Sequence, residues 1–133
     1  MSPLIQGKGE TILLADDEAD VREVIDEVLT SLGYSILLAV DGKEAVELFK
    51  ANISDISLVI MDFEMPRMGG VEAAKQMRQL DSEMPVIFAT GHDKEQSATS
   101  GEEVEGSIII SKPFPFADLS RTMRKAIDAR NKP

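Results

Sequence analysis

The sequence predicts an α/β fold, a single doubly wound (βα)5 domain in which a five-stranded parallel sheet carries helices on both faces. The first observation is that strand-period and helix-period segments alternate along the chain from residue 11 onward, as expected when helices connect parallel strands. The second is that four short apolar runs each end in a polar residue of a chemically useful type. The third is the length, since 133 residues with 43% hydrophobic content suit one globular domain.

The first apolar run, residues 11–15, is expected to form a strand that leads into a helix. Apolar residues in this helix follow the spacing i, i+3, i+4, i+7, i+8 and i+11, which places them on one helix face. They are Val21, Val24, Ile25, Val28, Leu29 and Leu32. Gly33 follows and is expected to cap the helix C-terminus, where glycine is common because it readily adopts the left-handed conformation.

A short strand over about residues 35–40 leads to a second helix. Asp41 is expected to cap the N-terminus of this helix, while the side chain of Glu44 reaches back in a capping-box arrangement. The helix is expected to end near Asn52. Its buried face is expected to consist of Ala45, Val46, Leu48 and Phe49.

Three strands and two further helices are expected in the rest of the chain. Residues 56–61 form the most apolar strand, which is therefore expected at the centre of the sheet, and a loop over residues 63–70 follows it. The other strands are residues 85–89 and 108–111, and the polar residues 92–106 between them are expected to form a short helix or loop. The third helix carries Val71, Ala74, Met77 and Leu80 on one face, and the last, from about Phe116 to Arg130, buries Phe116, Leu119, Met123, Ala126 and Ile127.

Composition excludes several classes of function. The net charge of −10 would repel a phosphate backbone, so direct binding of nucleic acid is not expected. No apolar stretch approaches the roughly 18–20 residues that cross a bilayer, so membrane insertion is not expected. There is no cysteine, hence no disulfide framework and no thiolate chemistry. Residues 1–9 lack the features of a signal peptide and are expected to be a linker or tag remnant, and we expect a cytoplasmic protein.

Acidic residues follow two of the expected strands. Asp16 and Asp17 come after the first strand, and Asp62 comes after the third. Because the carboxyl ends of parallel strands share one edge of a sheet, these side chains are expected to lie close together. They would repel one another unless a hard cation lay among them, and oxygen ligands favour Mg²⁺ or Mn²⁺ over zinc.

Asp62 is the best candidate for a nucleophile, because it stands alone at the end of the expected central strand. A carboxylate beside such a cation can accept a phosphoryl group and form an aspartyl-phosphate. Lys112, after the fifth strand, would pair with a phosphoryl oxygen, and Thr90, after the fourth, would donate a hydrogen bond to another. The four strand ends together therefore favour phosphoryl chemistry.

In these motifs the chain resembles the response-regulator receiver domain, the phospho-acceptor module of two-component signalling, which is a flavodoxin-like fold. The resemblance covers about residues 10–130, which we expect to be the receiver domain, with 131–133 as a C-terminal tail. The motifs occur in the family's order: Asp16-Asp17, then Asp62-Phe63-Glu64-Met65-Pro66 with Gly70, then Thr90-Gly91, then Lys112-Pro113-Phe114.

The resemblance implies a metal site and a phosphoryl donor. Asp17, Asp62 and the backbone carbonyl of Glu64 would bind Mg²⁺ directly, and Asp16 would hold a metal-bound water. Asp62 would receive the phosphoryl group from the phosphohistidine of a sensor histidine kinase or a histidine phosphotransfer protein. The domain would then be a regulatory phospho-acceptor and not an enzyme beyond its own phosphorylation and dephosphorylation.

The resemblance also assigns supporting roles. Thr90 and Lys112 would contact the phosphoryl group, with Gly91 and Pro113 supporting them and a cis bond before the proline. Glu64 and His92 fall at the two variable positions that tune hydrolysis of the aspartyl-phosphate. The chain departs from the family at Ile109, the switch position, where receivers commonly carry tyrosine or phenylalanine. The element that transmits the switch therefore stays open.

Two other functions compete with this interpretation. A haloacid-dehalogenase-like phosphatase also uses a nucleophilic aspartate with Mg²⁺, but it places Asp-x-Asp after the first strand. A receiver that acts without phosphorylation, purely as an interaction module, is disfavoured because no site residue is missing. The chain is either a stand-alone receiver or a piece of a larger protein, and Gly7-Lys8-Gly9-Glu10-Thr11 resembles the linker before the C-terminal receiver of a hybrid sensor histidine kinase.

Overall fold

The computed structural model describes residues 4–90, 107–111 and 114–131 of the chain, without the side chains of Thr90 and Asn131. The strands are β1 (Thr11–Ala15), β2 (Ser35–Ala39), β3 (Ile56–Met61), β4 (Val86–Thr90) and β5 (Ile108–Ser111). The helices of the described residues are α1 (Ala19–Ser31), α2 (Gly42–Ala51), α3 (Gly70–Leu80) and α5 (Phe116–Asn131). The weakly patterned residues 92–106 lie outside the described residues.

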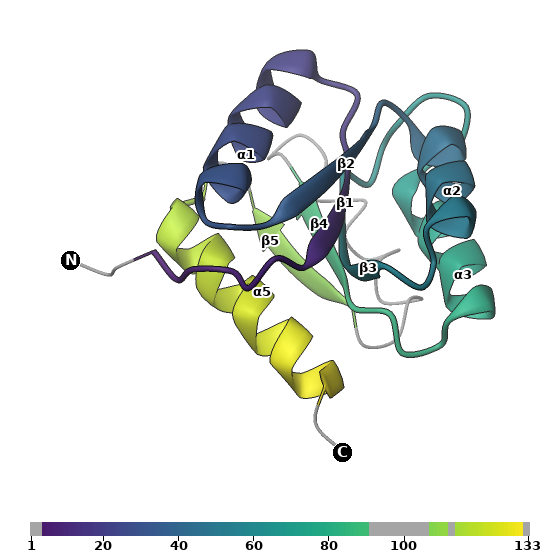
Figure 1. Ribbon diagram of the computed structural model, residues 1–133. Coiled ribbons are helices and arrows are strands. Elements are labelled where there is room, and N and C mark those ends of the chain that lie inside the picture. Colours follow the sequence, from purple (N-terminus) through teal and green to yellow (C-terminus); the bar gives the residue numbers. More distant parts are fainter. Residues whose placement is uncertain (1–3, 91–106, 112–113, 132–133) are drawn as a thin grey trace.

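The sheet has five strands in the order β2-β1-β3-β4-β5, and every neighbouring pair is parallel. This is the doubly wound arrangement that the alternating pattern predicted, and its strand order is that of the flavodoxin-like fold that the family resemblance implied. The strand β3 occupies the centre, as its apolar sequence indicated. Figure 1 shows α1 and α5 on one face of the sheet and α2 and α3 on the other.

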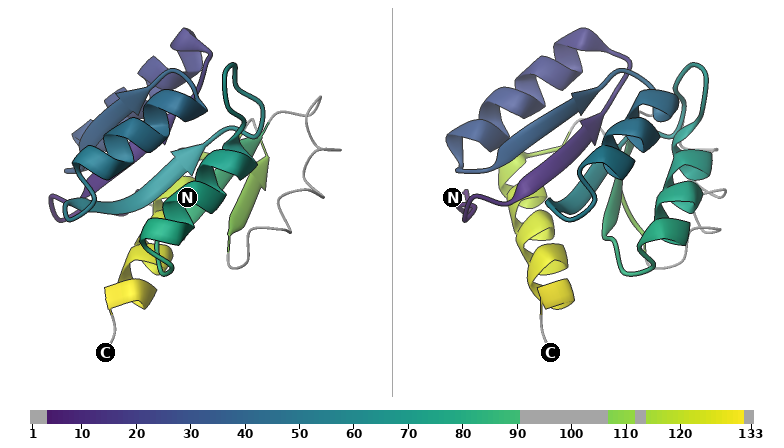
Figure 2. Two further views of the ribbon diagram at one scale, coloured as in Figure 1. Left: turned by 90° about the vertical axis from the view of Figure 1, so that its right-hand side faces the viewer. Right: turned by 45° about the vertical axis from the view of Figure 1, so that its right-hand side comes forward.

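Two hydrophobic clusters attach the helices to the sheet, one on each face. Alternate residues of each strand point to opposite faces, so β1 and β3 contribute to both clusters. The α2–α3 side includes Leu13, Phe49, Val59, Met61, Met77 and Phe88. The α1–α5 side includes Leu14, Leu29, Leu58, Ile60, Ile87, Leu119 and Met123. Figure 2 shows from two further directions that the α1–α5 layer and the α2–α3 layer lie on opposite faces of the sheet. The ends of the central strands are therefore held in place from both sides.

Helix ends follow the sequence prediction closely. Gly33 has a φ of 99° just after α1, the left-handed conformation expected of a C-terminal cap. Asp41 caps α2, since its carboxylate accepts a hydrogen bond of 2.8 Å from the Glu44 amide. The side chain of Glu44 reaches back as expected, but its carboxylate accepts a hydrogen bond from the amide of Val40. In a standard capping box the donor would be the amide of Asp41, so the contact lies one residue further back.

Two residues placed on apolar helix faces are half exposed. Val24 and Leu80 each expose 48% of their surface, because Val24 lies at the margin of the face centred on Ile25 and Leu29, and Leu80 is the last residue of α3. In contrast, the polar Ser120 on α5 is fully buried.

No helix in the described parts of the chain has the length and apolar character that a membrane span requires.

The segment before β1 packs against the domain. The Gly7 amide donates to the carbonyl of Leu32 at the end of α1 (2.7 Å), and the Ile5 amide donates to the Ser120 hydroxyl on α5 (3.1 Å). The ring of Tyr34 covers Gly7 so closely that a Cβ there would lie 2.7 Å from it. The segment expected to be a linker therefore bridges α1 and α5.

A partly buried ion pair continues this bridge. The Arg124 guanidinium donates to Glu10 (2.7 Å) and to Asp128 (2.8 Å), and the side chains of Arg124 and Glu10 are only 11% and 14% exposed. Burial alone would raise the pKa of Glu10, but hydrogen bonds from Arg124 and from the Lys8 amide outweigh it and lower that pKa. The charged form of Glu10 is therefore favoured by the fold.

Replacing Glu10 should make stability depend less on pH. Because the pKa of Glu10 is lowered in the folded state from 4.5, its contribution is present above that value and is lost as the pH falls through the folded-state pKa. We expect Glu10→Gln to lower the free energy of unfolding at neutral pH by about 1–3 kcal/mol, the range for hydrogen bonds to charged groups. Urea denaturation measures this, with the exposed Glu27→Gln as control. An equal loss in strong acid would contradict the assignment.

Candidate functional site

The carboxyl ends of β1 and β3 each deliver an aspartate to the same edge of the sheet. Asp16 directly follows β1, and its amide donates to the carbonyl of Ala39 in β2 (3.2 Å). Asp62 directly follows β3, and its amide donates to the carbonyl of Ala15 in β1 (3.2 Å). Both aspartates therefore lie one residue beyond the strands but are still held by hydrogen bonds to neighbouring strands.

Four carboxylates meet at this edge. Asp16, Asp17, Glu18 and Asp62 each place one oxygen within 4.8 Å of those of the others. Asp16 and Asp62 are 2% and 1% exposed, whereas Asp17 and Glu18 are exposed. We call these four residues the acidic cluster. Its all-oxygen donor set and its open side suit a hard divalent cation such as Mg²⁺.

The sequence analysis missed Glu18 as a member of the acidic cluster. Glu18 is the N-cap residue of α1, and its amide donates to the Asp16 carboxylate (2.9 Å). Arg22, one turn into α1, donates to the backbone carbonyl of Asp16 (2.6 Å). The start of α1 therefore orients Asp16, and the available signal was that the acidic run after the first strand continues for a third residue.

The loop after β3 folds back onto Asp62. The Gly70 amide donates to the carbonyl of Phe63 (2.7 Å), which closes the loop at the first residue of α3. A Cβ on Gly70 would lie 2.1 Å from the backbone oxygen of Asp62, so only glycine fits there without a shift. Phe63 is buried and stacks on Phe88 of β4 with ring centroids 4.6 Å apart. Asp62 is thus held in place by the strand before it, by the buried Phe63 after it and by the close approach of Gly70 at the start of α3.

Other predicted site residues fall at or beyond the limits of the described chain. The strand β4 ends at Thr90, which pairs in register with Ser111 at the end of β5. Ile109 lies in β5 and is 40% exposed. Glu64 lies in the loop after Asp62 with its side chain exposed. The remaining predicted site residues, Gly91, His92, Lys112 and Pro113, lie outside the described residues.

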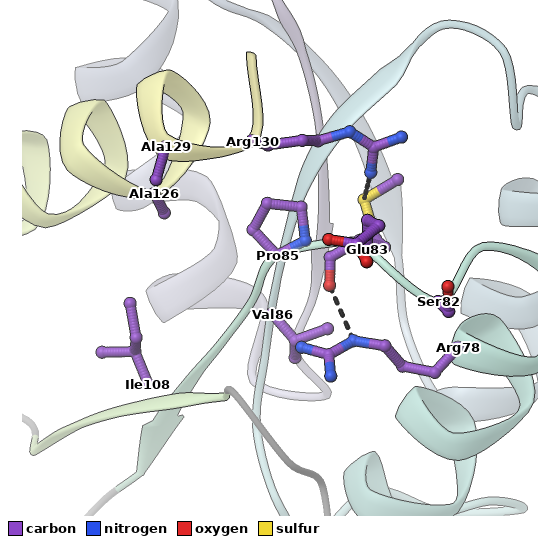
Figure 3. Close-up of a pocket in the computed structure, with 10 residues that line it drawn as sticks. Arg78, Ser82, Glu83, Pro85, Val86, Ile108, Ala126, Ala129 and Arg130 are labelled. Carbon is purple, nitrogen blue, oxygen red and sulfur yellow. Dashed lines mark hydrogen bonds between the residues drawn. The ribbon is translucent and has the colours of Figure 1, made fainter. Parts of the chain in front are cut away.

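A pocket of about 500 Å³ lies between the α3–β4 connection, the start of β5 and α5 (Figure 3). Its lining includes Pro85 and Val86 at the start of β4 and Ile108 at the start of β5, so it lies at the edge of the sheet opposite to the acidic cluster. Two arginines border it: Arg78 donates to the carbonyl of Met84 (2.7 Å), and Arg130 donates to Asp81 (2.6 Å). These contacts hold the α3–β4 connection against α5 and indicate a structural role.

Comparison with known proteins agrees with this geometry. A family model, the response regulator receiver domain, matches residues 12–124. Response regulator MprA of Mycolicibacterium vanbaalenii is 34% identical over 113 residues, which are 85% of this chain and 48% of that protein. The chain spans about half the length of the curated relatives it matches.

Solved structures agree as well. A response regulator receiver domain protein from Clostridium thermocellum has a TM-score of 0.84 at 30% identity, covering 91% of this chain and 96% of that one. A response regulator receiver protein from Sinorhizobium medicae has a TM-score of 0.83 at 32% identity, covering 93% and 98%. The similarity therefore extends over nearly the whole of both chains.

Enlarging Gly70 should destabilise the fold. We expect Gly70→Ala to lower the free energy of unfolding by about 1–3 kcal/mol, the usual cost of overpacking, because its Cβ would overlap the Asp62 backbone oxygen. Gly69→Ala is the matched control, since a Cβ there would lie 3.2 Å from the Phe63 oxygen. Urea denaturation compares the two variants, and an equal effect would contradict the role of the Gly70–Asp62 approach.

Mg²⁺ should stabilise the protein through the acidic cluster. At a Mg²⁺ concentration of about ten times its Kd, we expect about 1.4 kcal/mol of added stability and a higher Tm. Asp17→Asn should remove most of this gain, because it deletes one of the clustered charges. Thermal unfolding with and without Mg²⁺ measures the effect, with the exposed Asp20→Asn on α1 as control. A gain that survives in Asp17→Asn would place the ion elsewhere.

Proposed function

Because the chain belongs to the response regulator receiver domain family, we propose that Asp62 is its phospho-acceptor. The donor is the phosphohistidine of a partner sensor histidine kinase or histidine phosphotransfer protein. The observation that carries the proposal is the position of Asp62 at the end of the central strand, 1% exposed and within 4.8 Å of three further carboxylates. A nucleophile needs such a fixed position, because phosphoryl transfer depends mainly on alignment and on charge neutralisation.

The reaction is a transfer between two side chains. One oxygen of the ionised Asp62 carboxylate attacks phosphorus, the bond from phosphorus to the histidine nitrogen breaks, and the electron pair returns to the imidazole. The donor histidine is left unphosphorylated, and Asp62 carries an acyl phosphate. The fixed backbone of Asp62, anchored to Ala15 and packed against Gly70, holds the carboxylate for in-line attack.

The metal site of the proposal consists of Asp17, Asp62 and the backbone carbonyl of Glu64, with Asp16 holding a metal-bound water. Mg²⁺ would neutralise charge on the transferring phosphoryl group. The exposed Asp17 lies on the open side of the acidic cluster, and the buried Asp16 is oriented by the Glu18 amide. Thr90 and Lys112 are proposed as phosphoryl contacts, supported by Gly91 and Pro113.

The proposal makes the domain a regulator whose own chemistry is limited to gaining and losing one phosphoryl group. Glu64 and His92 are proposed to tune the rate of loss, and Ile109 occupies the proposed switch position. The cytoplasmic location expected from the sequence stays a prediction. The net charge of −10 argues against direct binding of nucleic acid by this domain.

Two placements of the domain stay as predictions. The matched segment is about half the length of the relatives named response regulators, which favours a piece of a larger protein over a stand-alone receiver. The resemblance of residues 7–11 to a hybrid-kinase linker favours the C-terminal receiver of such a kinase. The related proteins give no support to a haloacid-dehalogenase-like phosphatase or to a module that acts without phosphorylation.

Phosphorylation by a small donor tests the proposal directly. Incubation with acetyl phosphate and Mg²⁺ should add one phosphoryl group, measured by intact-protein mass spectrometry, and Asp62→Asn should add none because the nucleophile is lost. Asp55→Asn, an exposed acid just before β3, is the matched control and should be phosphorylated like the wild type. An unchanged wild-type mass would overturn the proposal, and sustained turnover of a phosphate ester would favour the phosphatase instead.

A further inference from the structure

An ion pair fastens the loop after Asp62 to the start of α2. The Arg67 Nε donates to the Asp41 carboxylate over 2.7 Å, although the two residues are 26 positions apart. Arg67 has a φ of 66°, a left-handed conformation that residues other than glycine rarely adopt. Because this conformation is unfavourable for arginine, contacts elsewhere in the loop must stabilise it.

Asp41 is well suited to hold this loop. One of its carboxylate oxygens accepts from the Glu44 amide and the other accepts from Arg67, and the side chain is only 5% exposed. The Glu44 hydrogen bond is the main reason why the pKa of Asp41 lies below its ordinary value, and Arg67 adds to it against the opposing effect of burial. Asp41 is therefore charged at neutral pH and fixed as the cap of α2.

Backbone contacts reinforce the ion pair. The Gly42 amide donates to the carbonyl of Met68 (3.1 Å), and a Cβ on Gly42 would lie 2.1 Å from that oxygen. At the base of the loop, the Gly70 amide donates to the carbonyl of Phe63 (2.7 Å). The loop is thus held at its base and near its end, and Glu64 lies between these two points.

We propose that the Arg67–Asp41 pair is a clasp that positions the loop for metal binding. The inference rests on the proposed function, which assigns the Glu64 carbonyl to the cation. Neither Arg67 nor Asp41 belongs to the acidic cluster. The clasp acts on the cation by restricting the backbone that carries this carbonyl, as groups behind a metal ligand commonly do.

Four variants and one control separate the effect of the clasp from that of its surroundings. Asp41→Asn keeps a side-chain cap on α2, since asparagine caps as well as aspartate, but it removes the charge that holds Arg67. Arg67→Ala removes the other partner, and the double variant removes both. Arg67→Lys keeps a cation in reach of Asp41. The exposed Lys43→Ala, in the first turn of α2, is the matched control for loss of a positive charge.

The readout is the Kd for Mg²⁺, measured by titration calorimetry well below the Tm of each variant. We expect Asp41→Asn and Arg67→Ala each to weaken binding by on the order of tenfold, as is typical when a group behind a ligand is lost. The double variant should be no weaker than either single one, because all three break the same pair. Arg67→Lys should retain most of the wild-type affinity for Mg²⁺, and Lys43→Ala should leave that affinity unchanged.

A purely structural role would give a different result. Glu10→Gln, remote from the loop, is expected to lower stability without changing the Kd for Mg²⁺, so loss of stability alone does not mimic loss of the clasp. Suppose that the wild type binds Mg²⁺ and is phosphorylated, and that the clasp variants bind Mg²⁺ equally well. The inference about the clasp is then wrong, and the proposed function stands. If the wild type neither binds Mg²⁺ nor accepts a phosphoryl group, both are wrong.

Discussion

The candidate site is organised around two carboxylates, Asp16 and Asp62, that the sheet holds close together and away from water. The backbone amide of each donates a hydrogen bond to a neighbouring strand, and Asp16 and Asp62 are 2% and 1% exposed, respectively. Like charges buried at short range destabilise a fold. The hydrophobic clusters on both faces of the sheet offset this cost. Asp17 and Glu18, on the exposed side, leave a path by which a cation can reach the buried pair.

The strands and helices of the described residues could be predicted from the sequence, because their signals are local. Alternating periodicity gave the parallel order of elements, and the apolar character of residues 56–61 placed β3 at the centre of the sheet. Gly33 and Asp41 marked helix ends through their own backbone and side-chain chemistry. Asp16, Asp17 and Asp62 could be brought together for the same reason, since the ends of parallel strands must share an edge.

Features that depend on contacts between distant segments could not be predicted. The pairing of Arg67 with Asp41 requires a left-handed residue in the middle of a loop, which neither periodicity nor composition indicates. Ser120 is buried because its hydroxyl accepts from Ile5, 115 residues away, a partner that helix spacing cannot reveal. Glu18 continues the acidic run after the first strand, but only the direction of α1 shows that its carboxylate reaches the acidic cluster. In each case the missing information was the relative placement of two elements.

The charges of the molecule indicate an order of events at the site. A protein with a net charge of −10 repels an anionic phosphoryl donor, and four clustered carboxylates make the repulsion strongest where the donor must arrive. A divalent cation bound first removes part of this repulsion and turns the cluster into a site for an anion. The loop after Asp62 is held to α2 by Arg67 and Asp41, and on the proposed clasp it would have its largest effect while the cation is being bound, before the donor arrives. In the proposed mechanism, the geometry of a surface loop would therefore influence a reaction at a buried carboxylate.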